Sequence, residues 1–168
     1  MQRLSNLTSL AAALALTGVF AVAGPGAPGQ SYAHGPGRDH GGFSAGEPGD
    51  PKQPARVVTV VMHEDGRKML FEPNRLEVKK GEQVRFVINN DGLLNHEFVL
   101  ATVAENRKHA ELMKKHPHME HDDPNAKQVP PYFTDQIVWR FTKRGEFEFA
   151  CLIPGHREAG MTGRIIVK

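Results

Sequence analysis

Residues 151–161 read CLIPGHREAGM and place a thiol, an imidazole and a thioether on one short stretch. Four residues separate Cys151 from His156, and four more separate His156 from Met161. Soft and borderline donors of this kind suit copper better than calcium, magnesium or manganese. One further imidazole would complete a plane of two histidines and one cysteine with a weak axial methionine, and His96 is the natural candidate. The stretch therefore predicts a mononuclear copper–thiolate site.

Cys151 stands at the end of an alternating segment. Phe147, Phe149 and Cys151 fall on one face of an extended chain, and Glu148 and Ala150 fall on the other. A strand that ends at the cysteine would point its thiol inward, and a thiolate away from water needs a positive partner such as a metal. Alone, a buried cysteine is usually an apolar core residue and a single histidine is usually structural. Their combination on one loop favours a metal site.

Short extended segments separated by turns make up most of residues 55–168. Alternating and β-branched patterns predict strands at 57–62, 68–71, 76–79, 84–90, 98–100, 137–141, 147–151 and 163–168. Asp65-Gly66 marks a hairpin turn between the first two. The sequence therefore predicts an all-β fold, an antiparallel β-sandwich in which residues 151–161 join the last two strands.

One helix interrupts these strands. Thr102 followed three residues later by Glu105 forms a capping-box pattern. Good helix formers fill residues 104–115, and Pro117 stops them. Residues 128–134 carry two prolines and are expected to form a loop.

The first 33 residues have the pattern of a signal peptide. A short basic start precedes an apolar run, and cleavage is expected after Ala33 or after Ala23. The run is shorter than the roughly 18 residues of a membrane span, although an uncleaved anchor is the alternative. We expect a soluble periplasmic protein with no stable membrane insertion. In such an oxidising compartment a lone cysteine is intermolecular, reactive or metal-bound, which again favours metal at Cys151.

Glycine and proline dominate the next segment. Residues 24–54 contain nine glycines and six prolines, so residues 34–54 are expected to be a disordered leader before a domain at 55–168. If cleavage follows Ala33, the amine and imidazole of His34 could chelate Cu(II), with His40 nearby. The alternative is a flexible leader without a metal role.

Several function classes are disfavoured. The chain carries 21 basic and 19 acidic residues, which indicates no nucleic-acid surface. Its 168 residues are too few for a multidomain copper oxidase or nitrite reductase, and no nucleophile–base arrangement occurs. We therefore expect no enzyme, with Cu(I) oxidation left open. Zinc could also bind one cysteine and two histidines, but Met161 would then have no ligand role.

The chain resembles the cupredoxin (plastocyanin/azurin) family. The resemblance rests on VRFVINN at 84–90, NHEF at 95–98, and Cys151, His156 and Met161 before a hydrophobic terminal strand. It implies a Greek-key sandwich and one type 1 centre with His96, Cys151 and His156 as strong ligands and Met161 as the long axial ligand. It also implies one-electron cycling between Cu(I) and Cu(II).

Two features depart from the small plastocyanins. Four residues separate Cys151 from His156, as in azurin-like loops. Glu97 follows His96 where many relatives have asparagine, although the backbone N–H at position 97 could still donate to the thiolate. The redox potential, the colour and the redox partner are left open.

An insert between His96 and Cys151 is rich in metal donors. Four histidines and two methionines lie within thirteen residues: His109, Met113, His116, His118, Met119 and His121. They could hold a second, weaker copper, or the insert could be a solvated helix and loop. The insert is similar to that of periplasmic copper-tolerance cupredoxins of Gram-negative bacteria, which implies a role in copper tolerance. A soluble electron carrier between respiratory proteins is the alternative.

Overall fold

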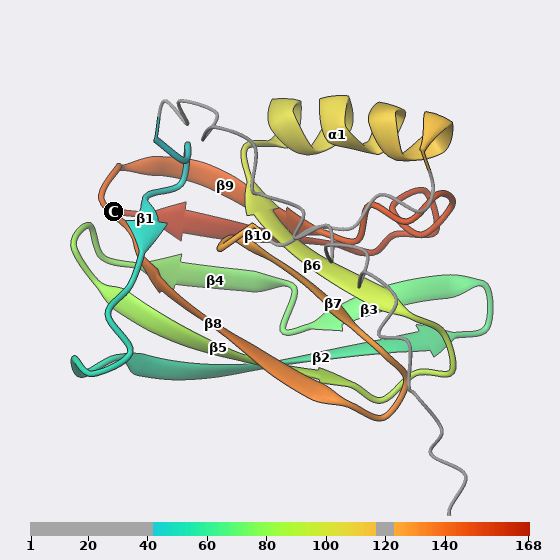
Figure 1. The fold of residues 1–168 in the computed structure, drawn as a ribbon, viewed down its shortest axis with the longest axis horizontal. Coiled ribbons are helices and arrows are strands. Elements are labelled where there is room, and N and C mark those ends of the chain that lie inside the picture. Colours follow the sequence, from blue (N-terminus) through green and yellow to red (C-terminus); the bar gives the residue numbers. More distant parts are fainter. Residues whose placement is uncertain (1–41, 117–122) are drawn as a thin grey trace, which may run out of the picture. The chain divides into compact units, whose positions relative to one another are not determined.

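The computed structural model describes residues 42–116 and 123–168. These residues form ten strands and one helix, arranged as two five-stranded sheets (Figure 1). The first sheet has the order β1 (Glu47–Pro48), β8 (Thr134–Arg140), β5 (Gln83–Asn90), β2 (Arg56–Asp65), β3 (Lys68–Glu72). The second has the order β4 (Arg75–Val78), β10 (Thr162–Val167), β9 (Gly145–Ala150), β6 (His96–Ala101), β7 (Ala126–Val129).

An aromatic core joins the two sheets. Phe86 from β5 lies 5.2 Å from Phe98 of β6, and Phe98 stacks on Phe149 of β9 at 5.0 Å between ring centroids. The alternation in β9 is confirmed on this face, where Phe147, Phe149 and Cys151 are buried. The predicted all-β sandwich with one inserted helix is therefore confirmed.

The strand pairing is mixed where the sequence predicted an antiparallel sandwich. Six of the eight pairings among the described strands are antiparallel, whereas β2 pairs parallel with β5 and β4 pairs parallel with β10. The chain leaves the first sheet after β3, forms β4 in the second sheet and returns as β5 beside β2. Such a crossover allows parallel neighbours, which a hairpin does not.

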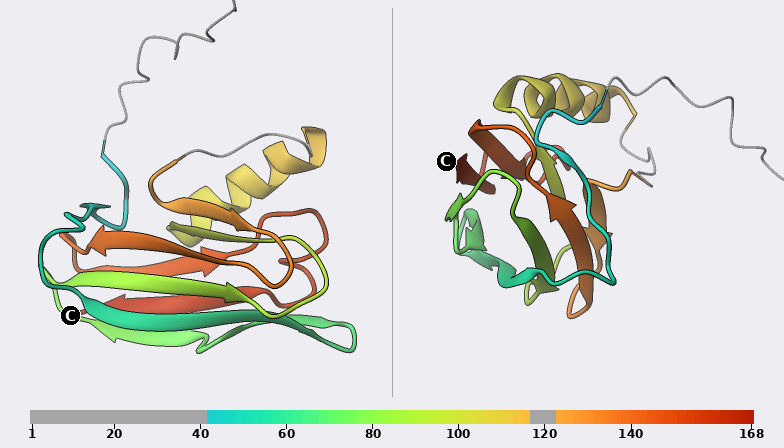
Figure 2. Two further views of the ribbon diagram at one scale, coloured as in Figure 1. Left: turned by 60° about the horizontal axis from the view of Figure 1, so that its bottom comes forward. Right: turned by 90° about the vertical axis from the view of Figure 1, so that its left-hand side faces the viewer.

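The inserted helix α1 (Val103–Lys115) covers the outer face of the second sheet, against β6 and β9 (Figure 2). Its capping box is confirmed, because Thr102 and Glu105 each bond the other's backbone N–H. The side chain of Met113, on α1, packs in a cluster with Val99, Ala150 and Leu152. Strand β6 is therefore buried on both faces.

The expected leader at 34–54 is wrong for residues 42–54. Strand β1 pairs with β8, Ala45 is fully buried, and the ring of Phe43 lies 5.2 Å from that of Trp139. A few apolar side chains thus fill one end of the core despite the glycine and proline around them. The predictions for residues 1–41, including His34 and His40, lie outside the described residues.

A second difference is strand β7, because Gln128 and Val129 were expected in a loop. The prolines at 130 and 131 end this strand and do not prevent it. Within the described ranges, no helix has the length and hydropathy needed to cross a membrane.

Candidate metal centre

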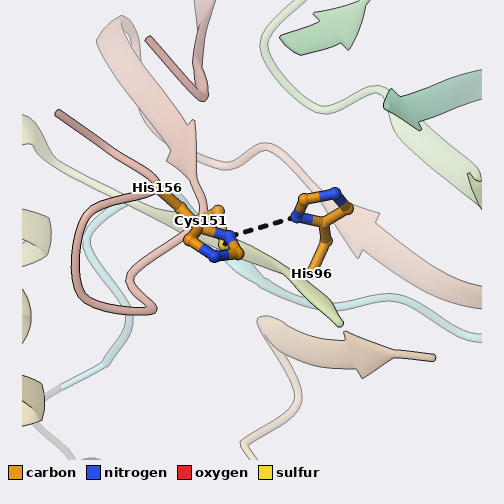
Figure 3. Close-up of side chains that lie close together, drawn as sticks. All are labelled: His96, Cys151 and His156. Carbon is orange, nitrogen blue, oxygen red and sulfur yellow. Dashed lines mark hydrogen bonds between the residues drawn. The ribbon is translucent and has the colours of Figure 1, made fainter. Parts of the chain in front are cut away.

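Three side chains, one from β6 and two from the segment between β9 and β10, meet at one end of the sandwich (Figure 3). His96 begins β6, Cys151 directly follows β9, and His156 lies in the loop between β9 and β10. The Nδ1 atoms of the two histidines are 3.2 Å apart, and Cys151 Sγ lies 3.3 Å from His156 Nδ1. The three potential ligand atoms all lie within 4.8 Å of one another.

Backbone hydrogen bonds shape the loop that carries His156. The N–H of Cys151 donates to the carbonyl of Met161 at 3.1 Å, and the N–H of Met161 donates to the carbonyl of His156 at 3.1 Å. Gly155 and Gly160 take positive φ angles of 92° and 104°, which glycine adopts without strain. The loop therefore places a fully buried Met161 next to the three converging residues.

The Cys151 thiol is fully buried. Burial raises its pKa to about 12, although the backbone N–H of Glu97 donates to Sγ at 3.3 Å and lowers it. The hydrogen bond expected from position 97 is therefore present. Without a bound cation the residue is a neutral thiol at pH 7, so ionisation requires a positive partner such as a thiolate-binding metal.

Both histidines are adapted to remain neutral. Burial lowers the pKa of His96, and burial together with the charge of His96 lowers the pKa of His156. A neutral imidazole keeps a ring nitrogen lone pair, which a metal requires. One soft thiol and two imidazoles, all facing one point, fit copper, and no hard carboxylate donor belongs to this cluster.

A carboxylate that the sequence reasoning did not identify lies behind His96. Glu64 Oε1 is 3.0 Å from His96 Nε2, and the same carboxylate accepts hydrogen bonds from the N–H groups of Leu93 and Leu94 at 2.9 and 3.1 Å. Burial alone would raise the pKa of Glu64, but these two hydrogen bonds, together with the charge of His96 when its ring is protonated, hold it below its usual value. The only signal in the sequence is an acidic residue two positions after the inward-facing Met62.

Glu97 places a second carboxylate close to the site. Its side chain is buried, and Oε2 has no hydrogen-bond partner among the described residues. Burial raises its pKa to about 7, opposed by a hydrogen bond from the backbone of Leu152. The departure from the family pattern at position 97 is thus a buried acid next to Cys151.

Of the residues predicted for a second copper, His109, Met113 and His116 lie in the described part of the chain. Met113 is buried in the apolar cluster under α1, and His116 is the exposed C-cap of that helix. His109 lies on α1, while His118, Met119 and His121 lie outside the described residues. The second site stays a prediction.

Comparison with known proteins gives a consistent result. Residues 58–168 match the family described as copper binding proteins, plastocyanin/azurin family. The copper-resistant cuproprotein CopI of Rubrivivax gelatinosus is 46% identical over 143 residues, which cover 79% of this chain and 85% of that protein. CopI of Pseudomonas aeruginosa is 35% identical over 156 residues, with 76% and 84% covered.

Among solved structures, auracyanin B superimposes with a TM-score of 0.59 at 24% identity, covering 74% of this chain and 96% of that one. This likeness supports the sandwich fold, and the family match at residues 58–168 includes His96, Cys151 and His156. The chain therefore belongs to the plastocyanin/azurin family of copper-binding proteins.

Proposed function

We propose that this chain is an exported, periplasmic type 1 copper protein that protects cells against excess copper. His96, Cys151 and His156 would hold the copper ion, and the thioether of Met161 would be a fourth, weaker donor. The observation that carries the proposal is the convergence of two imidazole Nδ1 atoms and one buried Sγ. Bound copper would supply a one-electron Cu(I)/Cu(II) couple.

The protein's own residues support such a role by fixing the positions of the donor atoms and shielding them from water. Strands β6 and β9 fix His96 and Cys151, and the N–H of Glu97 stabilises negative charge on the sulfur. His96 and Cys151 are fully buried, whereas His156 is 8% exposed. A redox partner or a copper donor would therefore approach the site most closely at His156.

Copper tolerance is supported by the relatives. The CopI proteins of Rubrivivax gelatinosus and Pseudomonas aeruginosa are named copper-resistant cuproproteins, and each is covered by this chain over more than four-fifths of its length. The donor-rich insert that begins on α1 is consistent with copper handling beyond a single centre. No enzymatic reaction is part of the proposal; oxidation of Cu(I) at the site would pass one electron to a redox partner protein.

A soluble electron carrier between respiratory proteins is a second candidate. Exposed apolar side chains from two loops, Leu93, Leu94, Tyr132 and Phe133, favour it. Asn90 connects the two loops, because its side chain donates to the carbonyl of Leu94 at 2.8 Å and its own carbonyl accepts from Tyr132 N–H at 2.7 Å. An apolar surface next to His96 would suit brief docking of a redox protein.

Deletion of the gene separates the two candidates. Copper tolerance predicts growth arrest at lower copper concentrations with normal respiration, and rescue by the wild-type gene but not by Cys151→Ser. Impaired respiration with unchanged copper sensitivity would favour the electron carrier. Full rescue of copper tolerance by Cys151→Ser would overturn a protective role for the thiolate site.

A further inference from the structure

The carboxylate of Glu64 lies behind His96 and is held there by hydrogen bonds. The residue lies near the end of β2, on the inward face of the strand with Val60 and Met62. Its carboxylate receives two backbone N–H groups, from Leu93 and Leu94, and lies 3.0 Å from the Nε2 atom of His96. Three donors thus converge on one carboxylate, which is enough to fix its position.

The loop before His96 is folded around this carboxylate. A Cβ atom added to Gly92 would lie 2.5 Å from Glu64 Oε2, so the loop approaches as closely as only glycine allows. Asn90 holds the loop from the other side: its Oδ1 accepts from Gly92 N–H at 2.9 Å, and its Nδ2 donates to the Leu94 carbonyl at 2.8 Å. The carboxylate and the imidazole therefore have little freedom to move apart.

The contact decides which nitrogen of His96 faces the other donors. An ionised carboxylate only accepts hydrogen bonds, so its partner Nε2 must carry the proton. The lone pair is then on Nδ1, the atom that lies 3.2 Å from His156 Nδ1. A carboxylate behind a ligating imidazole also makes that imidazole a stronger donor.

We propose that Glu64 is a positioning residue for the copper centre, which fixes the tautomer of His96 and biases the site towards Cu(II). The inference rests on the proposed type 1 site. A more basic imidazole backed by a negative charge stabilises the doubly charged ion more than the singly charged one. Glu64 therefore lowers the reduction potential of the centre.

The first test needs no metal. Nitrogen NMR of the imidazoles in the metal-free protein should show His96 with its proton on Nε2. The Glu64→Ala variant should give a mixture of tautomers, whereas Glu64→Gln, whose amide oxygen still accepts a hydrogen bond, should largely retain the wild-type form. A proton on Nδ1 of His96 in the wild-type protein would overturn the proposal.

The second test is the potential of the copper-loaded protein. Glu64→Gln should weaken the preference for Cu(II) over Cu(I) about tenfold, which raises the potential by about 59 mV for a one-electron couple. Glu158→Gln is the matched control, because Glu158 lies on the same loop as His156 and pairs with Lys114, and no hydrogen bond between it and the three site residues is present. Equal shifts of the reduction potential in the two variants would show that Glu64 acts only through its general charge, and would contradict the proposal.

The two tests separate failure of this inference from failure of the proposed function. Absence of a thiolate–copper spectrum in the wild-type protein would reject the type 1 site, while the tautomer measurement would still report on Glu64. A type 1 spectrum together with an unchanged potential in Glu64→Gln would reject the role of Glu64 alone. Unfolding of each variant by denaturant verifies that the fold is retained.

Discussion

The backbone N–H of Glu97 donates a hydrogen bond to the Sγ atom of Cys151 at 3.3 Å, so the residue that follows one candidate ligand contacts another. The carboxylate of the same glutamate is buried close by, with a pKa raised to about 7 by loss of solvent. One residue therefore stabilises the sulfur through its backbone and opposes its ionisation through its side chain.

Glu97 makes the stability of the metal-free protein depend on pH. The folded state keeps the proton up to about pH 7, whereas the unfolded chain loses it near the ordinary value of 4.5. The folded state thus binds more protons in this range, and the free energy of unfolding should fall as the pH rises from about 4.5 to about 7, by up to about 3 kcal/mol. Denaturant titrations of the wild type and of Glu97→Gln at several pH values measure this free energy. An identical pH dependence in the two proteins would refute the role of Glu97.

The apolar cluster under α1 predicts a stability effect without a change at the site. Met113 is 2% exposed and its neighbour Leu112 is 43% exposed, so they form a matched pair on one helix. Met113→Ala should lower the free energy of unfolding by about 2–5 kcal/mol through the cavity it leaves. Leu112→Ala should change it by about 0.5 kcal/mol or less. Equal losses in chemical denaturation would show that α1 does not pack as described.

The loop that carries His156 is held to β9 by an ion pair. Arg157 Nη2 contacts Glu148 Oε2 at 2.8 Å and Oε1 at 3.1 Å, and the Asn106 amide of α1 donates to Oε1 at 3.3 Å. The Glu148 side chain is only 10% exposed. Glu148→Gln should therefore cost about 1–3 kcal/mol of stability and speed the release of copper to a chelator.

A matched control for this variant is available on the same strand. Glu146 pairs with Arg164 at 3.0 Å, but its side chain is 51% exposed. Solvent weakens such a pair, so Glu146→Gln should cost about 1 kcal/mol or less and leave copper release unchanged. Faster copper release from Glu146→Gln than from Glu148→Gln would contradict the bracing role of the buried pair.

The start of the folded domain can be tested by truncation. A chain that begins at Gly42 keeps Phe43, Ala45 and β1, whereas one that begins at Ala55 loses all three. The shorter chain should be less stable by at least about 2 kcal/mol, because Trp139 loses its aromatic neighbour and one end of the core opens. Equal thermal unfolding midpoints for the two chains would show that the folded domain begins at residue 55.

Local patterns were sufficient to predict most of the fold and the converging site residues. Alternation located the core faces of β5, β8 and β9, because each inward position is set by the two-residue period of a strand. The capping box located the start of α1. Cys151, His156 and Met161 lie within one short stretch of sequence, so the chemistry of these donors could be inferred without knowledge of the fold.

Contacts between distant segments could not be inferred in this way. Residues 42–54 have the composition of a disordered segment, and only the open end of the core gives Phe43 and Ala45 a place to pack. The role of Glu64 depends on Leu93, Leu94 and His96, which lie about thirty residues further along the chain. Strand β7 pairs with β6, so its formation depends on a segment that is distant in the sequence.

The most direct measurement is the visible spectrum of the copper-loaded protein beside that of its Cys151→Ser variant. Copper bound to the Cys151 thiolate should give intense charge-transfer absorption in the wild type, and the hydroxyl of serine should leave the variant almost colourless. Intense absorption that survives the substitution would show that Cys151 is not the ligand and would contradict the assignment of the site.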